Sequence, residues 1–113
     1  MNSILHIGYV AALVETRALM LRKDGYLVVS ALGNEQGISM APSRPFDVVV
    51  VGFSDHHQTR NQMVLWLKEH LPGVPVVALA AHEYEAFPDA DCVTLSENPR
   101  VWLDKVAGCV KKS

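Results

Sequence analysis

Several side chains able to bind a metal ion or act as a nucleophile follow the apolar segment 46–52. They are Ser54, Asp55, His56 and His57. His82 follows a second apolar segment, 74–80, so it could lie near the two adjacent histidines. In open α/β sheets, ligands bind beyond the carboxyl ends of the strands. The first question is therefore whether these residues form a metal site or a catalytic site.

The spacing of these residues supports neither kind of site. Adjacent residues of a helix point in different directions, so His56 and His57 do not readily share one ion, and we expect a metal-free pair on the surface. Ser54 lies outside the G-x-S-x-G pattern of hydrolases, and nothing marks Cys92 as an activated thiol. Gly8 stands alone, without the phosphate-binding G-x-G-x-x-G loop. We therefore predict no enzymatic activity, no metal and no cofactor.

The composition predicts one compact domain over residues 1–113. Half of the 113 residues are apolar, enough for a single core, and the net charge of −2 disfavours binding to nucleic acid or to anionic membranes. The apolar runs are far shorter than the roughly 20 residues of a membrane helix, and no secretory signal is recognisable at the start. We expect a cytoplasmic protein in which Cys92 and Cys109 stay reduced.

Strand-like and helix-like segments alternate along the chain. We expect strands at 4–9, 26–31, 47–53, 74–80 and, more weakly, 92–95; helices are expected at 11–24, at 58–70 with Asp55 as its cap, and after the Asn98-Pro99 pair. A short helix fits at 35–40, and one or two turns fit within 81–91. This order predicts a parallel sheet with helices on both faces.

The sequence resembles the receiver domains of two-component response regulators over nearly its whole length. The resemblance is carried by ILHIGY at 4–9, RALMLRKDGYLVVSA at 17–31, segment 45–52, PVVALAA at 75–81 and ADCVTL at 90–95. It implies a three-layer, flavodoxin-like α/β fold. The sheet would have five parallel strands in the order 2-1-3-4-5, and the fourth helix would be short.

The same resemblance implies that the phosphorylation pocket is degenerate. Receivers use an acid pair after the first strand to hold Mg²⁺, an aspartate acceptor after the third, a hydroxyl residue after the fourth and a lysine after the fifth. These positions fall here on Gly8 and Tyr9, Gly52, Ala80 and Ser96. Phosphoryl transfer needs an oxygen nucleophile and a cation, and these residues supply neither an acceptor nor a metal site. Moving the acceptor to Ser54 or Asp55 is less favourable than using Asp55 as a helix cap.

We therefore expect a degenerate receiver that serves signal transduction as a phosphorylation-independent interaction or dimerisation module. Its partner would be a kinase, an output domain, another receiver or a second copy. The candidate interaction surface is the region of Tyr84, Phe87 and Trp102, because a short fourth helix would leave these aromatic residues thinly covered. The equally weighted alternative is that they fold back and fill the gap. By analogy with receivers, helix 11–24 could contact a kinase.

A second function remains open from the sequence. A flavodoxin-like domain could bind a small ligand, or act as an enzyme, in a pocket at the carboxyl ends of the strands. The residues around such a pocket would be Tyr9, Gly52, His56 and His82. Filling of this space by Tyr9 and Phe53 is the more ordinary outcome.

Overall fold

The structure is a computed structural model that describes residues 2–52, 56–83 and 85–112. Its centre is a five-stranded parallel sheet of order β2-β1-β3-β4-β5. The strands are β1 (Ser3–Gly8), β2 (Leu27–Leu32), β3 (Val48–Val51), β4 (Val76–Ala80) and β5 (Cys92–Leu95). The predicted fold class and strand order are confirmed.

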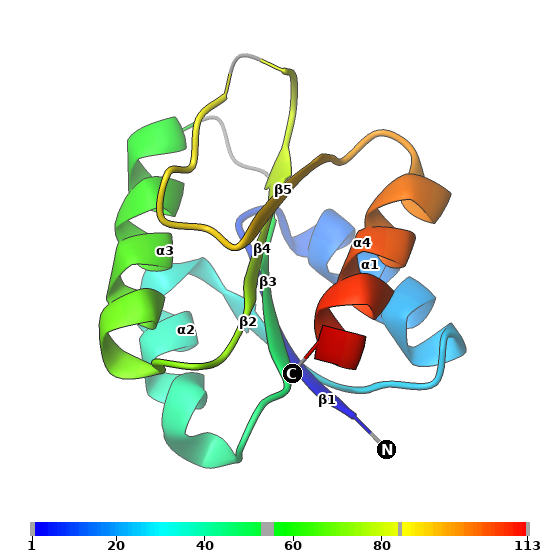
Figure 1. The fold of residues 1–113 in the computed structure, drawn as a ribbon, viewed down its shortest axis with the longest axis horizontal. Helices are drawn as coiled ribbons and strands as arrows, with labels where there is room; N and C mark the ends of the chain where they lie inside the picture. Colours follow the sequence, from blue (N-terminus) through cyan, green and yellow to red (C-terminus); the bar gives the residue numbers. More distant parts are fainter. Residues whose placement is uncertain (1, 53–55, 84, 113) are drawn as a thin grey trace.

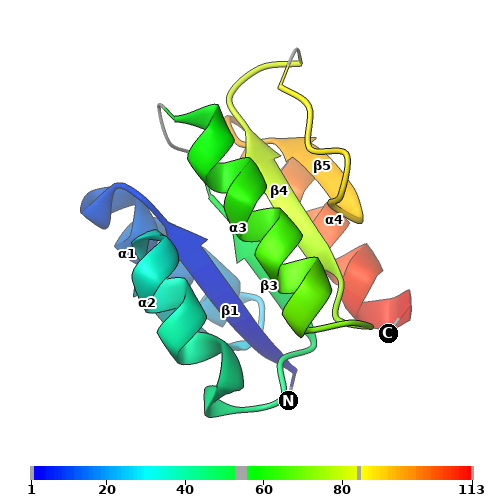
Figure 2. The same cartoon turned by 90° about the vertical axis from the view of Figure 1, so that its left-hand side faces the viewer.

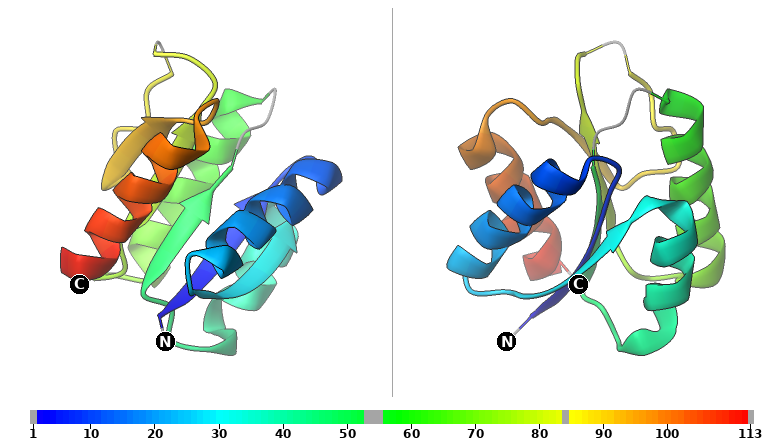
Figure 3. Two further views of the ribbon diagram at one scale, coloured as in Figure 1. Left: turned by 90° about the vertical axis from the view of Figure 1, so that its right-hand side faces the viewer. Right: turned by 180° about the vertical axis from the view of Figure 1, so that it is seen from behind.

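Helices cover both faces of the sheet (Figure 1). The helices α1 (Ala11–Lys23) and α4 (Pro99–Lys112) lie on one face, seen from the front on the left of Figure 3. The helices α2 (Gly33–Met40) and α3 (His57–His70) lie on the other, which Figure 2 turns toward the viewer. A short 3-10 turn, Ala41–Ser43, follows α2. No helix in the described part of the chain is long and apolar enough to cross a bilayer.

The two faces of the sheet have separate apolar cores. Leu5 and Ile7 of β1 belong to the core under α2 and α3, together with residues such as Met63. Ile4, one position earlier, belongs to the core under α1 and α4, which includes Trp102. Alternation of side chains along a strand separates these sets, and the central strands are apolar on both sides because helices cover both.

The helix ends follow the expected local chemistry where the structure describes them. The side-chain Oδ1 of Asn98 accepts a hydrogen bond from the Arg100 N–H at 3.0 Å, and Pro99 is the first residue of α4. Gly25 follows α1 with a positive φ of 98°, a conformation that glycine adopts without strain. The predicted cap of α3, Asp55, lies outside the described residues.

Segment 81–91 differs from the prediction, because no helix forms in its described residues 81–83 and 85–91. Carboxylates bind the backbone there instead of leaving it to form helical turns. Glu85 accepts a hydrogen bond from the Ala81 N–H at 2.6 Å, and Asp91 accepts one from the Val76 N–H at 2.7 Å. Asp91 also pairs with Lys68 of α3 at 2.8 Å. The helix expected between β4 and β5 is thus replaced by a loop, described at residues 81–83 and 85–91, which these carboxylates hold in place; we call it the tethered loop.

Trp102 provides a test of the core under α4, where its side chain is 1% exposed. In a Trp66→Phe variant the remaining tryptophan is expected to emit as a buried indole and to be quenched weakly by acrylamide. Trp102→Ala is expected to lower the free energy of unfolding by about 3–5 kcal/mol, because it leaves a large cavity. Quenching of Trp102 as strong as that of a free indole would contradict this packing.

Candidate functional site

The five predicted pocket positions lie at the carboxyl edge of the sheet, on or directly after the strands. The N–H of Gly52 donates to the carbonyl of Ile7 at 2.7 Å, which joins the ends of β3 and β1. The N–H of Ser96 donates to the carbonyl of Ala80 at 2.9 Å, which joins the ends of β5 and β4. Tyr9 follows Gly8 directly. The chain therefore brings these positions to one edge, as a parallel sheet requires.

Gly52 and Gly8 allow α1 to approach this edge closely. A Cβ atom on Gly52 would lie 3.3 Å from Nη1 of Arg17 and 3.2 Å from the carbonyl oxygen of Ile7. A Cβ atom on Gly8 would lie only 2.3 Å from a methyl carbon of Val14, which is too close. The position of the expected acceptor thus has no side-chain oxygen, and the guanidinium group of Arg17 lies close to it.

Two basic side chains are buried on the α1 side of the edge. His6 of β1 is 0% exposed, and neither of its ring nitrogens has a hydrogen-bond partner. Burial, assisted by the positive charge of Arg17, lowers the pKa of His6 to about 4, so the ring is neutral at physiological pH. Arg17 is 9% exposed, and burial lowers its pKa as well. Within the described residues, no group of three or more His, Cys, Asp or Glu side chains is arranged to hold a metal.

Tyr9 points to the opposite side of the sheet and connects three elements. Its hydroxyl donates to Oδ1 of Asn34 at 2.6 Å, and Nδ2 of Asn34 donates to the carbonyl of Thr59 at 3.0 Å. These bonds join the end of β1 to α2 and α3. Burial raises the pKa of the Tyr9 hydroxyl, with the nearby charge of Arg60 opposing this shift, so the group remains a protonated donor.

Arg60 of α3 holds the loop that replaces the expected helix between β4 and β5. Its side chain is fully buried, forms an ion pair with Glu85, donates to the carbonyl of Leu79 at 3.2 Å and lies over the ring of Phe87. Burial alone would raise the pKa of Glu85, but hydrogen bonds from Ala81 and Arg60, together with the charge of Arg60, lower it overall. Glu85 is therefore ionised at neutral pH, and the pair ties the loop to α3.

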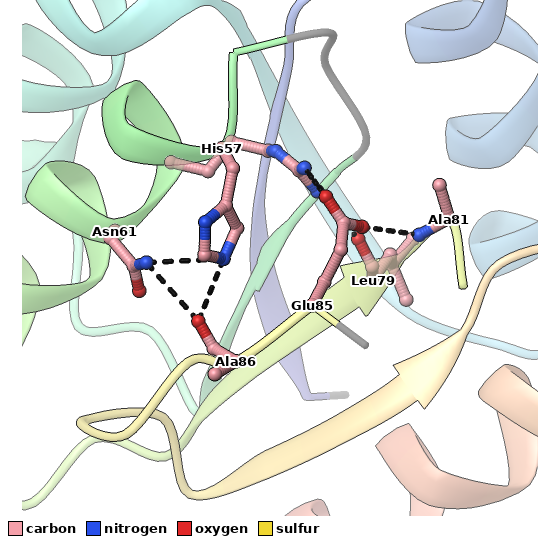
Figure 4. Close-up of polar contacts among 7 residues, drawn as sticks. His57, Asn61, Leu79, Ala81, Glu85 and Ala86 are labelled. Carbon is pink, nitrogen blue, oxygen red and sulfur yellow. Dashed lines mark hydrogen bonds and ion pairs between the residues drawn. The ribbon is translucent and has the colours of Figure 1, made fainter. Parts of the chain in front are cut away.

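His57 assists this attachment and is not arranged as a metal ligand. Its Nε2 lies 2.7 Å from the carbonyl oxygen of Ala86, which also accepts a hydrogen bond from Asn61 at 3.1 Å (Figure 4). The ring packs edge-on against Phe87, with centroids 4.8 Å apart. His56 and His82 are exposed.

The aromatic surface predicted from the sequence needs correction. Phe87 is 4% exposed and Trp102 is 1% exposed, so neither offers an open contact face. Phe87 packs into the core under α3, and Trp102 packs into the core under α4. Tyr84 lies outside the described residues. Phe87 and Trp102 fold back into the core, which was the alternative expectation, because burying their large apolar side chains is more favourable than exposing them to water.

A groove remains beside the loop, with a volume of about 400 Å³. It runs between the loop and the last two strands, and Phe87, Val93 and Leu95 form part of its apolar wall. A neighbouring hollow of about 320 Å³ includes His82 and Glu97. His82 lines both cavities, whereas Tyr9, Gly52 and His56 line neither of them.

The sequence reasoning missed the two arginines that organise this edge. Arg17 lies three residues after Val14 and four before Leu21, so it belongs to the buried stripe of α1. Arg60 precedes Met63, Val64 and Leu67 on the corresponding stripe of α3. A charged residue within an apolar stripe is the signal that would have found them, since such a residue is rarely buried without a specific role.

Protonation of His6 is expected to make the protein less stable in mild acid. Its pKa falls from 6.5 in the unfolded chain to about 4 in the folded protein, so between these values the unfolded chain binds the additional proton. Stability is then full above pH 6.5 and is lost as the pH falls toward 4. The loss between pH 7 and pH 5 is expected to be about 2 kcal/mol in urea unfolding experiments.

His6→Leu should remove this dependence on pH, whereas His56→Gln, which changes an exposed histidine, should retain it. An equal pH dependence in the wild type and in His6→Leu would contradict the assignment to His6.

Comparison with family models found no match, and no curated protein sequence matched the chain. Solved structures do match over almost the full length. A CheY-like receiver domain of Methanospirillum hungatei superposes with a TM-score of 0.85 at 16% identity, covering 99% of this chain and 95% of that one. The response regulator TrrA of Thermotoga maritima, in complex with Mg²⁺ and BeF, superposes with a TM-score of 0.84 at 15% sequence identity. The match covers 97% of this chain and 99% of that one.

TrrA in complex with the histidine kinase ThkA gives a TM-score of 0.83 at 18% identity, with 96% of this chain and 98% of that one covered. At identities this low the likeness concerns the backbone and not the site. The strand order, the placement of four helices and the full-length superpositions agree with one another. The chain therefore has the CheY-like receiver fold of response regulators.

Proposed function

We propose that this chain is a degenerate receiver domain that acts in signal transduction through protein contacts and without phosphorylation of an aspartate. It is not an enzyme and works in the cytoplasm. One observation carries the proposal: Gly52 occupies the end of β3, and its neighbour across the edge is the guanidinium of Arg17. A cationic group there repels Mg²⁺, and glycine offers no oxygen to a phosphoryl group.

The tethered loop supports a role in protein binding. Its conformation is held by the Arg60–Glu85 pair at one end and by Asp91 at the other. The surface beside it is therefore preformed, and preformed surfaces lose less entropy on binding. Val93 on the edge strand β5 is 41% exposed and lines the groove, so it offers apolar area to a partner.

The partner is proposed to be a second signalling protein: a kinase, an output domain or another receiver. TrrA, which has the same fold, has been crystallised with a histidine kinase. Self-association is the alternative, and light scattering over a concentration series distinguishes it. Contact of α1 with a kinase is a further proposal by analogy, and exposed Leu19 on that helix is compatible with it.

Loss of the phosphorylation chemistry is tested with Mg²⁺ and beryllofluoride, a mimic of the phosphoryl group. Adding Mg²⁺ to protein that already contains beryllofluoride is expected to leave all amide resonances unchanged. Gly52→Asp should be equally unresponsive, because Gly8 and Tyr9 still provide no carboxylate for the metal. TrrA serves as the positive control. A change in the amides of Gly8 or Gly52 that requires Mg²⁺ would refute the degenerate assignment.

The protein contact is tested with a photo-crosslinking amino acid at Val93 in cells of the native host. Leu65 on α3, 45% exposed against 41% for Val93, is a matched control outside the groove. Discrete adducts are expected from position 93 and not from position 65, and they should not change when a phosphodonor is supplied. Equal adducts from both positions, or none from position 93, would count against the groove as the contact site.

A further inference from the structure

Arg17 introduces a positive charge into the carboxyl edge that no described residue neutralises. The side chain is 9% exposed, and its Nη1 lies 3.3 Å from the point where a Cβ atom of Gly52 would be. The four ion pairs found among residues 2–52, 56–83 and 85–112 do not include Arg17, and neither do the side-chain hydrogen bonds found there. Burial lowers its pKa, and no opposite charge among the described residues acts against this shift.

Arg60 is a second buried arginine, and its contacts differ from those of Arg17. It is more deeply buried, at 0% exposed, and its guanidinium pairs with Glu85 and donates to a backbone carbonyl. Buried charges in proteins are ordinarily paired, because an uncompensated charge loses its hydration without gaining a partner. Arg17 lacks the equivalent carboxylate, so its partner is expected to come from outside the described residues.

The guanidinium of Arg17 remains accessible to such a partner. Both ring nitrogens of neighbouring His6 are completely enclosed without partners, whereas no nitrogen of Arg17 is enclosed in this way. The residual exposure of Arg17 therefore includes its guanidinium. The group lies where β1 and β3 end, next to the loop that leads into α1.

The first turn of α1 adds unpaired donors at the same edge. Its N-cap residue, Val10, provides no side-chain acceptor, and the first bond of the helix runs from the Val14 N–H to the Val10 carbonyl at 3.0 Å. The N–H groups of Ala11, Ala12 and Leu13 thus have no acceptor in the described part of the chain. Free N–H groups and the helix dipole favour an anion at this end of a helix.

We propose that Arg17, with the first turn of α1 and the glycine edge formed by Gly8 and Gly52, forms a binding site for a small oxyanion. The ligand binds without a covalent bond and without a metal, as a phosphate or carboxylate group that the planar guanidinium can hold through two hydrogen bonds. This site does not depend on the signalling partner, because it lies on the opposite face of the sheet edge from Tyr9 and away from the groove at Val93.

The experiment measures thermal unfolding in the presence of EDTA, with inorganic phosphate or acetate titrated at constant ionic strength set by chloride. The midpoint of the wild type is expected to rise saturably with one of the two anions, by roughly 5 °C at tenfold excess over its dissociation constant. Comparison of phosphate with acetate identifies which oxyanion class is bound.

Arg17→Met retains the length of the side chain and should abolish the rise, while Lys23→Met removes the same charge from the exposed end of α1 and should not. Arg17→Lys should retain part of the effect, since a point charge replaces a two-point contact. In parallel, the titration should shift the amide resonances of Ala11, Gly8 and Gly52 in the wild-type protein.

The proposal is overturned if neither anion raises the midpoint above the chloride baseline, or if Arg17→Met responds as the wild type does. Should Arg17→Met fail to fold, the amide shifts decide. Saturable shifts confined to Gly8, Gly52 and the first turn of α1 support the site, and shifts elsewhere exclude it. The use of EDTA separates this result from the Mg²⁺-dependent response that would refute the proposed function.

Discussion

The close approach of α1 to the ends of β1 and β3 determines which side chains lie beside the ends of these two strands. Two glycines make it possible, because a methyl group on Gly8 would collide with Val14 and one on Gly52 would crowd Arg17. The space beside Gly52 is thus taken by a cation that comes from the buried stripe of α1. Among the described residues at these strand ends, where α/β folds commonly bind a ligand, the side chain beside Gly52 is therefore cationic.

The fold could be predicted from the sequence because its signals are redundant. Valine runs without polar interruption indicate strands that are covered on both faces. The start of α4 is indicated twice, because asparagine is favoured as the N-cap residue and proline is favoured at the first helical position. Even the short helix α2 was expected, although it begins at Gly33, two residues earlier than predicted. Local propensity and apolar periodicity agree in these elements, so neither depends on distant contacts.

The site could be predicted only in part, since its decisive contacts join residues far apart in the chain. The absence of a side-chain oxygen at Gly52 is visible in the sequence, but the presence of Arg17 beside it depends on how α1 packs. The loop at 81–91 was expected to form a turn or two of helix, because nothing local reveals that Glu85 will pair with Arg60, 25 positions earlier. The same long-range contacts buried Phe87 and so removed it from the candidate surface.

The tie between the loop and α3 has a consequence for how information could pass through this domain. Two carboxylates, Glu85 and Asp91, tie the described part of the segment to α3 and to the ends of β4 through unmodified side chains. A partner protein that binds the surface beside this loop would respond to the concentration of the domain and not to its chemical modification. Control of such a component would rest with its synthesis, its removal and competition for its surface.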